Sequence, residues 1–303
     1  MTITEERPPQ EDLARQALGA PKRGVASRIA SKTGGGFVQF FLILIAIFWT
    51  VPAIGLFISS LRGAQDQSSG WWTFLLEPSQ LTVDNYSSLL SGGDLLGSFF
   101  NTVLITLPST LGVVVIGSLA AYAFAWMTFW GRDWIFLIVI GLLVVPVQVG
   151  LIPIAQLYGS LGIFGSIFGV VLFHIAFGLP FAIFLLRNFF SGIPRDLLEA
   201  ARMDGASEWT IFRRVVLPLG LPAIASLGIF QFLWVWNDFL IALVFASRDV
   251  QPLTVFLQSQ TRQFGESIDV LAPGAFMSLI VPLIVFFAFQ RYFVQGTLAG
   301  SVK

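Results

Sequence analysis

Long apolar runs alternate with short polar stretches along most of this 303-residue chain. A helix needs about 20 apolar residues to cross the hydrocarbon core of a bilayer. Six stretches meet that length. We therefore predict an all-α integral membrane protein with six membrane-spanning helices, at residues 37–59, 99–126, 134–157, 163–186, 219–245 and 271–289.

The first apolar run differs from a cleavable signal peptide. It begins late, is too long for a signal h-region, and is followed by no clear small-x-small cleavage site. We interpret it as a retained anchor. The predicted organisation is a polar tail, a first transmembrane helix, an extracytoplasmic loop, a continuous membrane domain and a C-terminal tail, at 1–36, 37–60, 61–97, 98–290 and 291–303.

Composition supports a membrane protein. Charged residues make up 11% of the chain and hydrophobic residues 55%, whereas a soluble domain has roughly 25% charged residues. This shortage excludes a water-exposed monomer, and the high hydrophobicity excludes intrinsic disorder. A net charge of zero argues against nucleic acid as a partner. The absence of cysteine excludes disulfides and thiolate metal sites.

The positions of Lys and Arg predict the orientation in the membrane. With the N-terminus inside, 14 of the 17 basic residues lie in cytoplasmic segments, and only Arg62, Arg248 and Arg262 lie outside. Cytoplasmic loops of membrane proteins carry an excess of Lys and Arg. We expect both termini to be cytoplasmic.

The loop at 191–218 contains several helix signals. Gly205 suits a left-handed C-terminal cap, Ser207 suits an N-cap, and Pro218 is expected to end a helix. The pattern predicts two short helices joined by a sharp bend at 204–206. In the first helix, Glu199 is spaced to pair with Arg195 and with Arg202.

The second helix of this loop is unusually apolar. Trp209, Ile211 and Phe212 lie outside any predicted span, and large apolar groups on a polar loop indicate a partner surface. The alternative is a loop that folds back onto its own bundle.

The same loop carries a family motif. Glu199-Ala200-Ala201, three residues, Gly205, nine residues and then Val215-x-Leu217-Pro218 resembles the EAA loop of bacterial ABC-transporter permeases, with Val215 where isoleucine is usual. In that family the loop docks into a cleft of the ATPase subunit. The candidate ATPase-docking residues are Glu199, Ala200, Ala201, Asp204, Gly205, Ala206, Ser207, Trp209, Phe212, Leu217 and Pro218.

The resemblance covers roughly residues 81–303. The segments 81–86, 101–102, 236–239 and 290–303 are similar to elements of maltose-type carbohydrate permeases. The resemblance implies a type-1 ABC importer permease fold, with the transmembrane type-1 domain at 98–290. It also implies that the tail around Gly296 and Gly300 contacts the ATPase, and that the protein resides in a bacterial plasma (inner) membrane.

A few polar and aromatic residues are predicted within the spans. Asp238 is the only carboxylate placed well inside one, flanked by Trp234, Trp236 and Asn237, and His174 is the only histidine. Intramembrane ionisable groups are functional candidates, so these five residues are candidates for the translocation path. The alternatives are a structural or gating hydrogen bond for Asp238 and a hydrogen-bonded bundle residue for His174.

No catalytic or metal site is predicted. The chain has three lysines, none in a Gly-rich Walker A context, and one histidine allows neither a zinc site nor a catalytic triad. ATP and Mg are therefore expected on a partner ATPase rather than on this chain.

The resemblance implies four partners besides the lipid bilayer, namely a homodimeric ABC ATPase, a second homologous permease, an extracytoplasmic binding protein and a sugar such as maltose, trehalose or another α-glucoside.

Two other classes of function remain open at this point. The chain could be an ABC permease for a non-sugar solute such as a peptide, phosphate or polyamine. It could also be an ion-coupled secondary carrier or channel, although one Asp and one His are few for a proton relay. An intramembrane enzyme has less support because no catalytic constellation is present.

Overall fold

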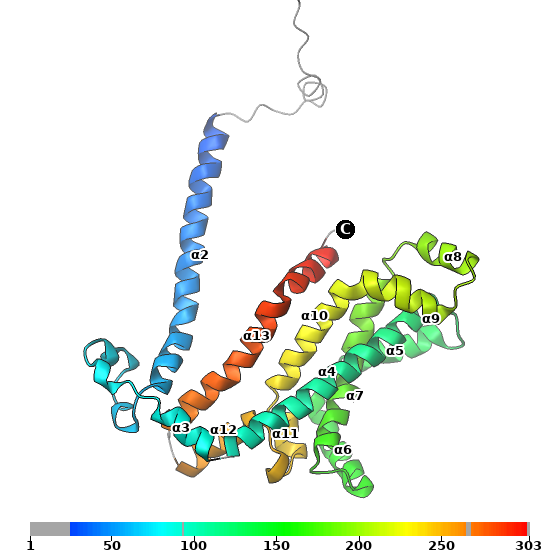
Figure 1. Ribbon diagram of the computed structural model, residues 1–303. Helices are drawn as coiled ribbons and strands as arrows, with labels where there is room; N and C mark the ends of the chain where they lie inside the picture. Colours follow the sequence, from blue (N-terminus) through cyan, green and yellow to red (C-terminus); the bar gives the residue numbers. More distant parts are fainter. Residues whose placement is uncertain (1–24, 93, 265–267, 302–303) are drawn as a thin grey trace, which may run out of the picture. The chain divides into compact units, whose positions relative to one another are not determined.

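The computed structural model describes the backbone of residues 25–92, 94–264 and 268–301, and the side chains of 36–92, 94–260 and 269–290. The chain divides into two units, Met1–Gly55 and Leu56–Lys303, which are described separately. The α-helices (Figure 1) are α2 (Val25–Ser60), α3 (Asp84–Ser91), α4 (Asp94–Trp126), α5 (Arg132–Leu142), α6 (Val147–Leu161), α7 (Ile167–Phe190), α8 (Arg195–Met203), α9 (Glu208–Ile211), α10 (Leu217–Trp236), α11 (Leu240–Phe245), α12 (Leu253–Phe264) and α13 (Ile268–Ser301). Short helical turns are η1 (Ala64–Asp66), η2 (Trp71–Leu75), η3 (Pro78–Gln80), the π-helical η4 (Phe212–Val216) and η5 (Arg248–Val250).

Membrane-spanning length is confirmed for most of the predicted helices. Within the described residues, five helices are long and apolar enough to cross a bilayer: Gly36–Ser60, Asp94–Trp126, Ile167–Phe190, Glu208–Trp236 and Asp269–Gln290. A bent helix pair, α5 and α6, gives a sixth candidate. The side chains of α2 from Phe37 to Trp49 are largely exposed, as suits an apolar helix surface in contact with lipid.

The third span predicted at 134–157 is not one continuous helix. Helix α5 ends at Leu142, α6 begins at Val147, and the pair is bent by 102°. Pro146 lies at the break with an extended ψ of 135°. A break at this position is expected, because proline has no backbone N–H to donate and disfavours helical backbone in the residue before it. Helix α6 ends at Leu161, and Gly162 follows with a φ of 70°, a left-handed conformation that is common after a helix C-terminus.

Helices α4, α7 and α10 form the centre of the second unit. Helix α4 packs along α7, and α10 packs against α4, α7 and α13. The α4–α7 interface depends on small residues, because a Cβ added to Gly117 would lie 2.8 Å from the Cβ of Ala182. Small residues let membrane helices approach closely, which increases their van der Waals contact.

The loop between α2 and α3 is ordered by one buried arginine. Arg62 is 1% exposed and donates hydrogen bonds to the carbonyl oxygens of Asp66 and Ser69 at 2.5 and 3.1 Å. The segment 81–86 closes this loop from the other side. Asn85 donates to the carbonyl oxygen of Arg62 at 2.7 Å, and the Tyr86 hydroxyl pairs with Ser60 Oγ at 2.7 Å.

Candidate functional site

The loop at 191–218 has the bend that the sequence predicts. Helix α8 ends at Met203, and Gly205 takes a φ of 78°, a left-handed conformation that costs little for glycine. Ser207 then accepts a hydrogen bond from the backbone N–H of Thr210 at 3.4 Å as the N-cap of α9. The prediction of two helices joined at 204–206 is confirmed.

The second helix of the loop does not end at Pro218, so that prediction is wrong. The chain passes from α9 through the π-helical η4 directly into α10, where Pro218 occupies the first turn. A π-helical turn bonds residues five apart and widens the helix, which gives room for the proline ring and leaves its missing N–H harmless. The loop therefore joins the α10 span as one continuous helix.

The candidate docking residues divide by exposure. Most of them are exposed: Glu199, Ala200, Asp204, Gly205, Ser207, Trp209 and Pro218. Ala201, Ala206 and Leu217 are half-buried. Trp209 is 61% exposed, whereas Phe212 is 6% exposed, and its ring lies 5.3 Å from that of Tyr122.

Phe212 is therefore part of the interior and offers little to a partner, contrary to the prediction. Ile211 is fully buried beside it, as is Leu198 of α8. These side chains join the buried cluster at the ends of α4, α7 and α10. The loop is thus both packed onto its own bundle and exposed on its outer side.

A polar network connects the loop to α4. Arg202 Nε donates to Glu208 Oε1 at 3.0 Å, and the Tyr122 hydroxyl donates to Glu208 Oε2. The hydrogen bond to Glu208 raises the pKa of the Arg202 guanidinium, whose positive charge pairs with the Glu208 carboxylate. Trp126 Nε1 donates to the carbonyl oxygen of Phe190 at 3.1 Å and thereby ties α4 to α7.

This network differs from the salt bridges expected from spacing. Arg195 and Glu199 do pair, at 3.6 Å, but Arg202 turns away from Glu199 to Glu208. Sequence reasoning missed both Tyr122 and Glu208, which lie 86 positions apart. The only available signal was a tyrosine in the last turns of a predicted span, one turn before the interfacial Trp126.

Asp238 lies at a break between helices, not inside a span as predicted. Helix α10 ends at Trp236 and α11 begins at Leu240, and the Asp238 carboxylate accepts from the backbone N–H groups of Ile241 and Ala242 at 3.2 and 2.9 Å. The Asp238 carboxylate thus satisfies two backbone N–H groups in the first turn of α11, one residue before the N-cap position Phe239, where the span predicted over 219–245 is interrupted.

His174 and Trp234 lie next to Asp238. His174 is fully buried, with Nε2 3.6 Å from Asp238 Oδ2 and Nδ1 2.9 Å from the carbonyl oxygen of Val170. The His174 and Trp234 rings are 5.3 Å apart in an edge-on arrangement. Three of the five candidate path residues are thus neighbours at one point, where α7 meets the end of α10.

The other two path candidates face elsewhere. Trp236 is 1% exposed, stacks on Phe232 and donates through Nε1 to the carbonyl oxygen of Ser278 in α13 at 3.1 Å. Asn237 is exposed and donates back to Leu233 of its own helix at 2.8 Å. Gly296 and Gly300 lie in the last turns of α13, outside the residues whose side-chain surroundings are described.

Comparisons with known proteins agree with this architecture. The profile of the family described as binding-protein-dependent transport system inner membrane component matches residues 94–298. The osmoprotective compounds uptake permease protein GgtD of Synechocystis sp. is 48% identical over 272 residues, which cover 88% of this chain and 91% of GgtD. The alpha-glucoside transport system permease protein AglG of Rhizobium meliloti is 48% identical over 233 residues, which cover 75% of this chain and 61% of AglG.

The fold also has a solved counterpart. A chain in the crystal structure of a bacterial ABC transporter involved in the import of the acidic polysaccharide alginate superposes with a TM-score of 0.73, at 23% identity, over 90% of this chain and 100% of that one. This likeness supports the type-1 importer permease fold. Since the family profile spans about two thirds of the chain and ends close to its C-terminus, the protein belongs to the inner membrane components of binding-protein-dependent transport systems, the permeases of ABC importers.

Proposed function

We propose that this chain is the transmembrane permease subunit of an ATP-driven importer for a carbohydrate, with α-glucosides such as trehalose and maltose as the first candidates. The observation that carries the proposal is the loop at 191–218. Its outer side presents Trp209 and the Gly205 bend, while its inner side is built into the buried ends of the spans. The names of GgtD and AglG support an organic osmolyte or sugar as the cargo.

The partners follow from this role. A homodimeric ATPase binds ATP and Mg and receives the exposed side of the 191–218 loop, which places that loop and both termini in the cytoplasm. A second, homologous permease completes the membrane domain, and an extracytoplasmic binding protein delivers the sugar. Within the part of the chain that the structure describes, no group of His, Asp or Glu side chains could hold a metal ion, and we assign ATP hydrolysis to the partner ATPase.

The structure suggests how ATP binding reaches the spans. The second helix of the loop continues into α10 through η4, and the Arg202–Glu208–Tyr122 network joins the same loop to α4. A displacement of the loop by the ATPase therefore moves both spans together. Such rigid coupling suits alternation between inward- and outward-facing states, which requires two discrete packings of the same elements.

Docking is tested by co-purification of the chain with its co-encoded ATPase, using a matched pair of tryptophan variants. Trp209 and Trp72 are 61% and 60% exposed, but Trp72 lies in the loop between α2 and α3. We expect Trp209→Ala to weaken the complex about tenfold or more, as is typical of an interface hot spot, and Trp72→Ala to leave it intact. Equal retention by both variants, or ATP-independent uptake, would overturn the proposal.

A further inference from the structure

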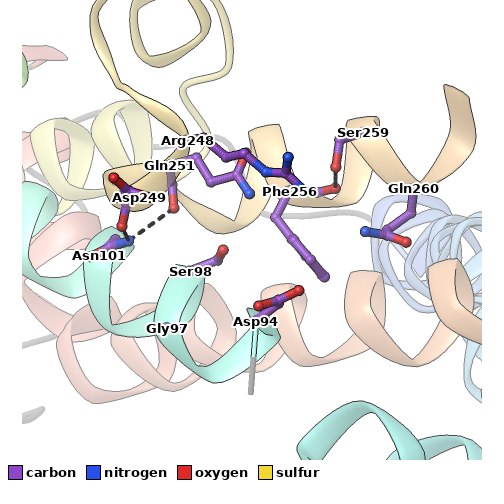
Figure 2. A pocket seen from close by; sticks show the side chains of 10 residues that line it. All are labelled: Asp94, Gly97, Ser98, Asn101, Arg248, Asp249, Gln251, Phe256, Ser259 and Gln260. Carbon is purple, nitrogen blue, oxygen red and sulfur yellow. Dashed lines mark hydrogen bonds between the residues drawn. The ribbon is translucent and has the colours of Figure 1, made fainter. Parts of the chain in front are cut away.

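A polar hollow lies at the end of α4 opposite the 191–218 loop. It measures about 730 Å³ and is bordered by the first turns of α4 and by the segment from η5 into α12 (Figure 2). Helix α4 has 33 residues, a length of about 50 Å, so the hollow and the Tyr122–Glu208 contact occupy opposite membrane faces. In the proposed transporter this is the face on which the sugar arrives.

The walls of the hollow are held together by hydrogen bonds. Asn101 of α4 donates to the carbonyl oxygens of Asp249 and Gln251 at 3.3 and 3.2 Å. One residue further along α4, the buried Thr102 accepts from the backbone N–H of Leu253 at 2.8 Å. The hollow is thus formed in advance, and a ligand binds it without first ordering its walls.

The lining combines groups that recognise neutral, hydroxyl-rich molecules. Asp94 and Asp249 supply carboxylate acceptors and Gln260 supplies an amide, while Phe256 borders the hollow but is 5% exposed and belongs to a buried apolar cluster. Small-ligand sites of about 300–1,000 Å³ combine apolar surface with a few polar groups of this kind. With Arg248 as the only cation among the lining residues, two carboxylates against one guanidinium favour a neutral ligand over an anionic one.

We infer that this hollow is a binding site for a neutral sugar at the mouth of the transport path, contributed by this chain itself. The inference rests on the proposed function and makes it more specific. The carboxylates accept hydrogen bonds from sugar hydroxyls, and the amide both donates and accepts. A uronic acid would bring its own carboxylate close to Asp94 and Asp249 and is repelled.

The test fills the hollow without disturbing its walls. Gly97 borders it, and a Cβ added there would meet nothing within 4 Å, so Gly97→Leu occupies the space while the backbone stays in place. Gly141 of α5 has equally open surroundings and lies away from the hollow, which makes Gly141→Leu the matched control. Radiolabelled trehalose and maltose are titrated against the full chain in lipid nanodiscs, with digalacturonate as the acidic probe.

We expect the parent chain and Gly141→Leu to bind a neutral disaccharide in preference to digalacturonate, and Gly97→Leu to bind it at least tenfold more weakly. Binding that Gly97→Leu leaves unchanged, a preference for digalacturonate, or no binding of either disaccharide by the parent would each overturn the inference. Sugar uptake by cells expressing the parent chain with its co-encoded subunits is measured separately. Normal uptake by Gly97→Leu cells refutes the site alone, whereas absence of sugar uptake by parent cells refutes the proposed function.

Discussion

The Tyr122 hydroxyl donates a hydrogen bond to the Glu208 carboxylate, so the last turns of α4 are joined to the first residue of α9. Both residues sit at the boundary between the spans and the loop that carries the family motif. The Tyr122 ring also lies against Phe212. The contact is therefore a direct connection between the proposed ATPase-docking element and a membrane-spanning helix.

Removing this hydroxyl should weaken coupling more than assembly. A hydrogen bond to a charged group contributes about 1.5–3 kcal/mol, and Tyr122→Phe deletes it while keeping the ring that packs on Phe212. We expect the variant to co-purify normally with the ATPase, and sugar uptake per ATP hydrolysed to fall about tenfold. Tyr158→Phe, at a buried tyrosine in α6, is the control and should retain full coupling.

The other bond of the network should matter less. The Arg202 and Glu208 side chains are 37% and 41% exposed, and exposed ion pairs typically contribute less than about 1 kcal/mol because water and salt screen them. We expect Arg202→Gln to change the free energy of unfolding in detergent by less than about 1 kcal/mol. If Arg202→Gln instead lowered sugar uptake per ATP hydrolysed as much as Tyr122→Phe does, the two hydrogen bonds of the network would act as one unit.

The bend between α8 and α9 should depend on glycine for conformational reasons alone. At Gly205 φ is 78°, and a Cβ would meet nothing within 4 Å, so Gly205→Ala introduces strain without a clash. The left-handed conformation costs a non-glycine residue roughly 1–2 kcal/mol. We expect lower thermal stability and weaker ATPase co-purification for Gly205→Ala. Gly141→Ala, at an equally open helical position, should show neither effect.

The limits of sequence reasoning here have identifiable causes. Span length and composition were sufficient to predict five helices of membrane-spanning length, and glycine and serine at 205 and 207 were sufficient to predict the loop. Prolines were harder to interpret: Pro146 lies at a break within a predicted span, whereas Pro218 is accommodated by a π-helical turn. Whether a proline ends a helix depends on backbone pairing around it, which its position in the chain does not reveal.

Exposure was equally hard to predict. Trp209 and Phe212 are three positions apart and both aromatic, yet Trp209 is 61% exposed and Phe212 only 6%. The difference is set by Tyr122, which lies in another helix and packs on Phe212. Arg202 pairs with Glu208, which is also held by Tyr122 of α4. A contact with a distant helix of this kind leaves no signal in the local sequence pattern.

Substitutions at Asp238 separate its two possible roles. Its carboxylate accepts from the backbone N–H groups of Ile241 and Ala242 in the manner of a helix cap, and it also faces the buried His174. Loss of an N-cap typically costs about 1 kcal/mol, and asparagine replaces aspartate well at such positions. If the role is structural, Asp238→Ala should lower the unfolding temperature while Asp238→Asn stays close to the parent.

A role in contacting sugar gives a different pattern. The apparent KM for sugar uptake would then rise in both Asp238→Asn and Asp238→Ala, even where the unfolding temperature is preserved. The cap-like geometry leads us to expect the structural pattern, with KM unchanged in Asp238→Asn. A raised KM in that variant, at parental stability, would instead place Asp238 on the sugar's route, because only a ligand contact distinguishes the carboxylate from its amide without changing the fold.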